Sequence, residues 1–363
     1  MNQTLFALHR WLGLLSGIFL LFIGLSGSLL TFKKPLEQWL HPALYEIHQP
    51  GNRISIDSAY SIIYSKYGSR FASCSLDIPA SSTNVYEFTL EQPVENFYSR
   101  GSYVVDLHPY SGVILREGYC NEMSTSLIHW MIYFHDSFHL GKIGMFVVTL
   151  SSLIIFLSMI TGILFYGKKI AGVLLFRFSL KRKSKMQVYR TIHLYIGVWA
   201  LLFNIIVCFT GFWMMKSTLS PDAWKMDTQV KKMRLSISLD SCLVKSRQVL
   251  PGFLPDFISI PFAQDESVEI DGNMENSSRL MYGDASSVMF DPRNETVTGV
   301  TDIAQASFPK NFTAMFWQLH IGGYGGVVVR ILYCIGGLMP GTLAVSGYIL
   351  WWKRKKMYSA LRR

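Results

Sequence analysis

Charged residues are scarce in this chain. Only 16% of its 363 residues are Asp, Glu, Lys or Arg, while half are hydrophobic. Soluble globular proteins carry about 25% charged residues, so a soluble enzyme or binding domain fits this composition poorly. The composition indicates a membrane protein with polar insertions.

Several cofactor and metal motifs are also missing. No CxxC or CxxCH occurs among the five cysteines, which argues against a covalent c-type haem and a cysteine-rich zinc site. No GxGxxG opens a helix, so the chain has no nicotinamide or flavin domain of its own. Cys208 and Cys334 fall in apolar stretches as packing residues. At most one disulfide can form among Cys74, Cys120 and Cys242.

Four apolar stretches are long enough to cross a bilayer, which takes about 20 helical residues. They are Leu5–Phe32, Ile143–Tyr166, Ile192–Met215 and Phe316–Trp352. The first is longer than the apolar part of a signal peptide, and Lys33-Lys34-Pro35 follows it in place of a small-residue cleavage site. We therefore expect it to be retained as a membrane span.

The positive charge is distributed unevenly and predicts the orientation. Within the net charge of +10, segments 167–190 and 353–363 carry eight and six basic residues and no acid. Segments 33–122 and 216–310 carry ten and thirteen acids against seven and ten basic residues. Because cytoplasmic loops collect Lys and Arg, we expect both termini and the middle loop in the cytoplasm and the acidic segments outside. The charge therefore reflects topology and does not indicate a nucleic-acid partner.

The chain contains one pattern twice. Leu8-His9-Arg10-Trp11-Leu12-Gly13 corresponds to Ile192-His193-Leu194-Tyr195-Ile196-Gly197, 184 residues later, and the match continues to Ser26-Gly27 over Thr210-Gly211. The second and fourth stretches also correspond. His139 aligns with His320 and, after the alignment shifts by four residues, Thr161-Gly162 aligns with Ser346-Gly347. Parallel repeats of this kind favour sites built between the two halves.

Alternating residues around Tyr103–Ile114 and Val288–Gly299 predict strands and a turn in each outside segment. We expect an α-helical membrane protein: four transmembrane helices in two parallel tandem repeats, with two small α+β periplasmic domains. The expected helices are 1–32, 129–166, 191–215 and 316–352, and the periplasmic domains are 33–128 and 216–315. The basic cytoplasmic loop is 167–190 and the basic tail is 353–363.

Histidines mark both ends of the apolar stretches. His9 and His193 start the first and third stretches on the inside, and His320 opens the fourth on the outside. His135 and His139 precede the second stretch, four residues apart and so on one face of a helix. A lone histidine here is more often a packing residue, but ionisable groups at membrane depth are costly and usually functional. Two layers of paired imidazoles suit six-coordinate haem, which has no open position for oxygen chemistry.

Other residues near the two histidine layers have two interpretations each. Arg10, Lys142 and Arg330 can pair with haem propionates or with lipid headgroups. Gly13–Gly17 and Gly322–Gly326 allow either close helix packing or room for a flat macrocycle. A zinc or copper site would gather its ligands at one point, often with carboxylate or thiolate. The histidine pairs are separated by the membrane, which favours haem.

These motifs resemble those of the PepSY-associated transmembrane family, which includes iron-regulated membrane proteins and inner-membrane ferric-siderophore reductases. The resemblance rests on Leu8–Gly13, Leu25-Ser26-Gly27, Phe134–Gly141 and Leu319–Gly322, and covers essentially the whole chain. It implies that the two outside segments are PepSY-type modules in the periplasm of a bacterial inner-membrane protein.

The resemblance also implies two b-type haems, each held by two histidines. His9 and His193 would hold the inner haem, and His320 would hold the outer one with His135. The internal repeat instead aligns His139 with His320, so His139 stays an alternative ligand. His129 lies off that helix face and is expected to be an ordinary surface residue.

We therefore expect an oxidoreductase that carries electrons from a cytoplasmic reductase or a membrane quinol to a periplasmic ferric siderophore or other ferric chelate. No catalytic residue beyond the haem ligands is assigned. Two other functions stay open: a non-redox regulatory module that restrains a peptidase, and a siderophore transporter. The transporter would use a helix break at Gly336–Gly341, although four spans without an internal acid argue against a proton-coupled carrier.

Overall fold

The computed structural model describes residues 3–93, 96–98, 101–178, 184–225, 235–261, 266–281 and 285–360. Four segments in this part of the chain are helical, long and apolar enough to cross a membrane: Gln3–Leu30, Gly141–Leu174, Leu201–Leu219 and Gly323–Met357. Leucine, isoleucine and valine side chains on these helices stay exposed, as expected of surfaces that face lipid. The prediction of a multi-pass membrane protein is confirmed.

The helices fall into spans and shorter flanking pieces. The span helices are α1 (Gln3–Leu30), α5 (Gly141–Leu174), α7 (Leu201–Met215) and α11 (Gly326–Ala360). The shorter helices are α2 (Lys33–Leu40), α3 (Ile56–Tyr67), α4 (Leu127–Ser137), α6 (Lys185–Trp199), α8 (Leu239–Val249), α9 (Phe308–Ala314) and α10 (Phe316–Ile321). Single-turn helices are η1 (Pro42–Leu44), η2 (Lys216–Leu219), η3 (Pro221–Trp224), η4 (Ile303–Gln305) and η5 (Gly323–Gly325).

Two expected spans are divided by backbone breaks. The third stretch ends one helix at Trp199 and begins another at Leu201, so His193 lies on α6 and not on the span helix α7. At the fourth, Gly322 adopts a left-handed conformation with φ of 69°, which separates α10 from α11. The expected break at Gly336–Gly341 is wrong, because α11 continues through Pro340.

The outside segments together form one antiparallel sheet of eight strands. The strands are β1 (Ser73–Asp77), β2 (Tyr86–Glu91), β3 (Ser102–Leu107), β4 (Ile114–Tyr119), β5 (Phe253–Pro261), β6 (Val268–Met274), β7 (Ser286–Phe290) and β8 (Val297–Thr301). Their spatial order is β4-β3-β2-β1-β5-β6-β7-β8. Each half supplies four strands and one covering helix, and strands were expected in both outside segments. The two expected separate domains instead share one sheet, because the halves join edge to edge where Ser75 faces Ser259.

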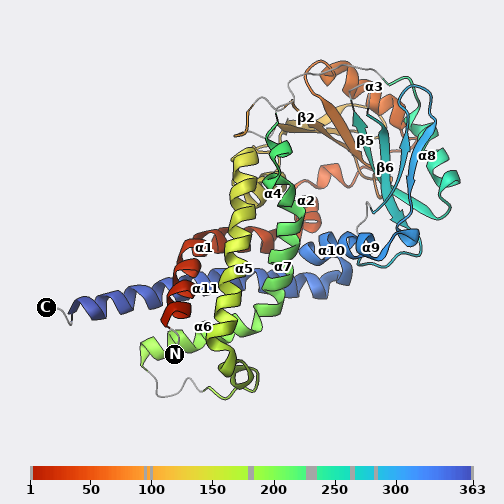
Figure 1. Cartoon of the computed structure of the whole chain (residues 1–363). Helices are drawn as coiled ribbons and strands as arrows, with labels where there is room; N and C mark the ends of the chain where they lie inside the picture. Colours follow the sequence, from red (N-terminus) through yellow and green to blue (C-terminus); the bar gives the residue numbers. More distant parts are fainter. Residues whose placement is uncertain are drawn as a thin grey trace.

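The sheet packs its apolar face against α3 and α8 (Figure 1). Phe71, Leu76, Phe88, Ile258 and Phe290 are fully buried in that core, which continues across the β1–β5 junction. Serines cap the helices that frame the sheet: Ser55 precedes α3 and Ser238 precedes α8, each accepting a backbone hydrogen bond. The five cysteines are free.

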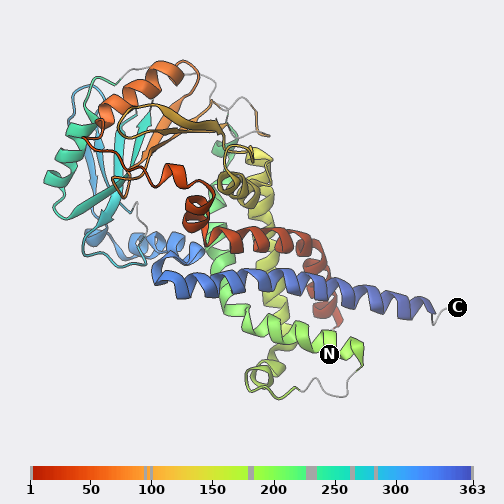
Figure 2. The same ribbon diagram turned by 180° about the vertical axis from the view of Figure 1, so that it is seen from behind.

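The spans pair as α1 with α11 and α5 with α7, side by side in both views (Figure 1, Figure 2). Gly24 and Gly337 lie where α1 meets α11, and a Cβ added to Gly24 would come within 2.5 Å of the Gly337 carbonyl oxygen. The start of α1 and the end of α11 lie away from the sheet (Figure 2). The sheet and the chain ends are thus on opposite sides of the spans.

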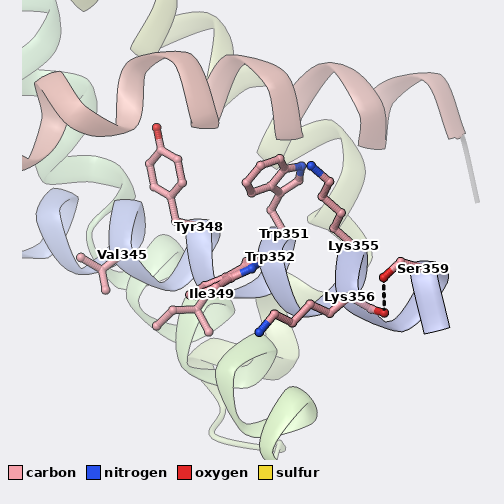
Figure 3. A pocket seen from close by; sticks show the side chains of 8 residues that line it. All are labelled: Val345, Tyr348, Ile349, Trp351, Trp352, Lys355, Lys356 and Ser359. Atoms are coloured by element: carbon pink, nitrogen blue, oxygen red, sulfur yellow. Dashed lines mark hydrogen bonds between the residues drawn. The ribbon is translucent and has the colours of Figure 1, made fainter.

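Aromatic and basic residues gather near the end of α11 (Figure 3). Lys355 Nζ lies 5.5 Å from the ring centroid of Trp351, and Lys356 Nζ lies 4.7 Å from that of Trp352. Tyr348 points to α1 and donates a hydrogen bond to the Leu14 carbonyl at 2.6 Å. Tryptophan beside lysine is typical of the membrane interface, so this belt indicates where α11 leaves the bilayer.

Candidate functional site

The structure brings His9 and His193 together from the two halves of the chain. Their ring centroids are 6.5 Å apart, with an angle of 74° between the ring planes. His9 lies on α1 and His193 on α6, at equivalent positions of the repeat. Two imidazoles on opposite sides of one haem iron, with bonds of about 2 Å, have centroids roughly 6 Å apart.

A second pair, His135 and His320, lies toward the sheet. Their ring centroids are 6.2 Å apart, at an interplanar angle of 59°. Both residues are on short helices that precede a span: His135 on α4 and His320 on α10. The two pairs thus have nearly the same separation at opposite ends of the spans.

All four rings are held through their Nδ1 atoms. His9 Nδ1 lies 3.0 Å from the Ser158 carbonyl oxygen, and His320 Nδ1 lies 3.1 Å from that of Val207. A carbonyl oxygen only accepts, so both rings carry their proton on Nδ1.

The other two rings bind serine hydroxyls and reach the same tautomer. Ser26 Oγ lies 2.9 Å from His135 Nδ1 and can donate to the carbonyl of Phe22 at 2.8 Å or of Ile23 at 3.1 Å. Ser346 Oγ lies 2.8 Å from His193 Nδ1 and donates to the Leu343 carbonyl. Each hydroxyl must therefore accept from the ring. The lone pair of every ring is on Nε2, the arrangement that metal-ligating histidines use.

A hydroxyl residue followed by glycine accompanies each histidine. The four pairs are Ser26-Gly27 beside His135, Thr210-Gly211 beside His320, Thr161-Gly162 beside His9 and Ser346-Gly347 beside His193. A Cβ on Gly27 or on Gly211 would approach the neighbouring imidazole to 2.9 Å. The hydroxyl residue thus orients the ring, and the glycine leaves space for it.

A cavity of about 650 Å³ includes both His9 and His193 in its wall. Its wall extends from Phe6 and Arg354, near the chain ends, to Leu20, Asn204 and Pro340. Four basic residues line it, Arg10, Lys169, Arg190 and Arg354, and none of the described lining residues is acidic. An apolar cavity of this size with cations at one end suits a flat macrocycle that carries two carboxylates.

The structure separates His139 from this arrangement. The interpretation that His135 and His139 share a helix face is wrong, because α4 ends at Ser137 and both Phe138 and His139 have left-handed φ angles of 49° and 60°. The His139 ring lies 4.7 Å from the ring of Trp130. The residue facing His320 is His135.

His129 is not an ordinary surface residue, contrary to expectation. Its side chain is only 19% exposed, and its Nε2 lies 3.6 Å from Glu87. The charged residues around His129 lie on the sheet and on α2. Residue spacing in the sequence could not predict that these elements pack against α4.

The basic residues proposed for propionates differ in their surroundings. Arg10 lines the cavity and contacts the rings of Phe6 and Trp11, while its buried Nε makes no hydrogen bond. Lys142 instead donates to the Ala223 carbonyl at 2.9 Å. Arg330 is half-buried near the start of α11. Arg10 therefore has the surroundings best suited to an anionic group of a ligand.

The model of the PepSY-associated TM region matches residues 6–354. The chain belongs to this family. The match extends over both histidine pairs, all four spans and the eight strands. No curated protein matches the chain.

The residues of this PepSY-associated protein fit haem on three counts. The imidazole separations suit two axial ligands, the Nδ1 atoms are held, and the inner pair lies in a cavity with basic residues. The hydroxyl–glycine pairs were visible in the repeat of the sequence, but spacing alone did not relate them to the histidines of neighbouring helices.

Proposed function

We propose that this protein is a di-haem b-type electron carrier of the bacterial inner membrane that reduces a ferric siderophore or another ferric chelate in the periplasm. The supporting observation is the pair of facing imidazoles at each end of the spans, 6.5 Å and 6.2 Å apart by ring centroid. Each pair takes one histidine from each half of the chain, so neither half forms a site alone.

His9 and His193 would hold the inner haem, and His135 and His320 the outer one. When bound, haem would supply a one-electron carrier at each pair of histidines. The carbonyl and hydroxyl partners fix each ring, which limits the rearrangement that accompanies a change of iron charge. Arg10, Lys169, Arg190 and Arg354 would neutralise the propionates of the inner haem.

The direction of transfer follows from the charge distribution. The basic loop and tail lie on the side of the chain ends, which we assign to the cytoplasm, and the sheet lies on the other side. An external donor is required, either a cytoplasmic reductase or a membrane quinol, since the chain has no nicotinamide or flavin motif. Each ferric ion accepts one electron, and the ferrous product is bound more weakly by hard oxygen ligands.

Absorption spectroscopy tests the proposal. We expect about two b-type haems per purified chain. One haem should be lost in His9→Ala or His193→Ala and the other in His135→Ala or His320→Ala, while His139→Ala keeps both. The single-haem variants should also lose reduction of an external ferric chelate. A protein that stays colourless after reconstitution with haem would overturn the proposal.

A further inference from the structure

A buried group of charged side chains joins the first half of the sheet to α2 and α4. Arg116 on β4 lies at its centre, 2.5 Å from Glu37 on α2, 2.5 Å from Asp106 on β3 and 3.6 Å from Glu87 on β2. His129 on α4 reaches Glu87 from the other side at 3.6 Å. We call these five residues the Arg116 cluster.

The cluster is largely buried, and its acidic side chains outnumber its permanently positive one. Asp106 is fully buried, and the side chains of Glu37 and Arg116 are 7% and 10% exposed. Three carboxylates surround one guanidinium, so a single positive charge would leave two negative charges unbalanced. Buried charges without partners are strongly unfavourable, so the cluster must bind protons.

The neighbouring residues support proton binding close to neutral pH. Burial and the nearby charge of Glu87 raise the pKa of Asp106 to about 7. Burial alone would lower the pKa of His129, but its contact with Glu87 raises it above the ordinary value. Tyr45 also faces the acids, and its pKa is raised by burial and by Glu87. Lys33, at the start of α2, lowers the pKa of Glu87, and Lys33 and Lys34 both act on the neighbouring Asp77.

Asp77 connects the cluster to solvent. It is exposed and lies opposite Glu87 across the β1–β2 pair. Desolvation by the surrounding protein atoms and the charge of Glu87 raise the pKa of Asp77 to about 6. Asp77 therefore extends the acidic group of the cluster towards solvent.

The cluster lies next to the outer histidine pair. His129 precedes His135 by six residues on α4, about 9 Å along a helix axis. Ser126, which caps α4, donates to Glu37 at 3.1 Å, so the cluster also fixes the start of that helix.

We propose that the Arg116 cluster is a proton-binding site coupled to the outer histidine pair. It takes up a proton at His129 or a neighbouring carboxylate when the outer site gains an electron, and releases it when the electron leaves. The added negative charge stabilises the protonated form of the cluster, since the two are close in a poorly polarisable region. This inference rests on the proposed function.

A redox titration of the full-length His193→Ala variant, which keeps the outer pair, tests the coupling. We expect the midpoint potential to fall as pH rises between about 5 and 8, by at most about 59 mV per pH unit for one proton per electron. His129→Gln should reduce this slope by at least half, and the exposed His48→Gln should leave it unchanged. A flat potential, or a full slope in His129→Gln, would overturn the inference.

A second measurement separates this inference from the question of haem binding. Histidine-selective NMR of the unloaded full-length protein should show that His129 titrates above its ordinary pKa, and that Glu87→Gln moves the titration to lower pH. If the protein binds no haem, the proposed function fails, while this titration still reports on the cluster. A His129 that stays neutral down to about pH 5 would contradict a proton-binding role.

Discussion

Asp57 and Asp240 each cap the helix on which the other lies. Asp57 on α3 accepts hydrogen bonds from the Leu239 amide at 2.6 Å and the Ser238 hydroxyl at 2.5 Å, at the start of α8. Asp240 on α8 accepts from the Ile56 and Asp57 amides at 3.2 and 2.9 Å, at the start of α3. The exchange joins the two outside segments above the β1–β5 junction.

Removing either carboxylate should destabilise the joined sheet. A lost cap leaves helix amides without partners, which costs about 1–3 kcal/mol. Asp57→Ala and Asp240→Ala should therefore lower the Tm of the detergent-purified protein, by about 2–4 °C for each kcal/mol. Asp222→Ala, which removes an exposed side chain paired with Lys225, is the matched control. An unchanged Tm in both cap variants would show that the exchange is not needed for stability.

Hydropathy predicted the membrane-spanning elements because a span requires a long apolar run. The first stretch, Leu5–Phe32, differs from α1 by only two residues at each end. Hydropathy could not predict the breaks at Ala200, where apolar residues continue, and at Phe138, because tertiary contacts decide the local backbone. For this reason the expected common helix face of His135 and His139 was wrong.

Strand alternation predicted hairpins in both outside segments but not the sheet they form together. The β1–β5 pairing joins residues about half the chain apart, and alternation reports only which face of a strand is buried. The same limit applies to His129, whose partner Glu87 is on a distant strand. The repeat was informative for the inner pair, because its equivalent residues His9 and His193 meet. It aligned His320 with His139, whereas His135 faces His320.

The glycines beside the histidines should be unequally sensitive to alanine. An added Cβ would approach the imidazole to 2.9 Å at Gly27 or Gly211 but only to 3.7 Å at Gly347, an ordinary contact. Gly27→Ala and Gly211→Ala should displace the outer rings and weaken outer haem binding about 10–100-fold, as changes beside metal ligands do. Gly347→Ala should keep both haems. Haem titration of the apoprotein gives the affinities, and equal affinity in all three variants would contradict the steric argument.

Loss of the Ser26 hydroxyl should weaken binding of the outer haem more than loss of the Ser16 hydroxyl, which lies on the same helix but does not contact a histidine. Ser26→Ala removes the acceptor of His135 Nδ1, which frees the ring to rotate. We expect about 10–100-fold weaker outer haem binding. Ser16 bonds only the Leu12 carbonyl of its own helix, so Ser16→Ala is the control. Ser26→Thr should restore binding, since Thr210 takes the same role beside His320.

Glu295 should make the stability of the second half sensitive to acid. It accepts from Lys245 Nζ at 2.5 Å and from the Ser238 amide at 3.0 Å, and these bonds lower its pKa to about 2. A lowered folded-state pKa stabilises the fold above the unfolded value of about 4.3, and this contribution is lost as pH falls towards 2. Glu295→Gln should thus lower the Tm at pH 7 and lower it clearly less near pH 3. The same lowering of the Tm at both pH values would exclude this linkage. The control Glu46→Gln, at an exposed residue, should leave the Tm unchanged at both pH values.

Arg10 should raise the midpoint potential of the inner haem. Arg10 lines the cavity that includes His9 and His193, and its buried Nε makes no hydrogen bond to the residues that the structure describes. A positive charge at roughly 10 Å favours the reduced iron by about 1–2 kcal/mol at an effective dielectric constant of about 20. Arg10→Gln should therefore lower the potential of the inner haem by tens of millivolts, measured in the His320→Ala background, where only the inner pair is complete. Lys355→Gln is the matched control, because Lys355 lies outside this cavity in the groove at the end of α11. If both substitutions shift the midpoint potential equally, the shift comes from the overall surface charge, and the predicted specific effect of Arg10 is contradicted.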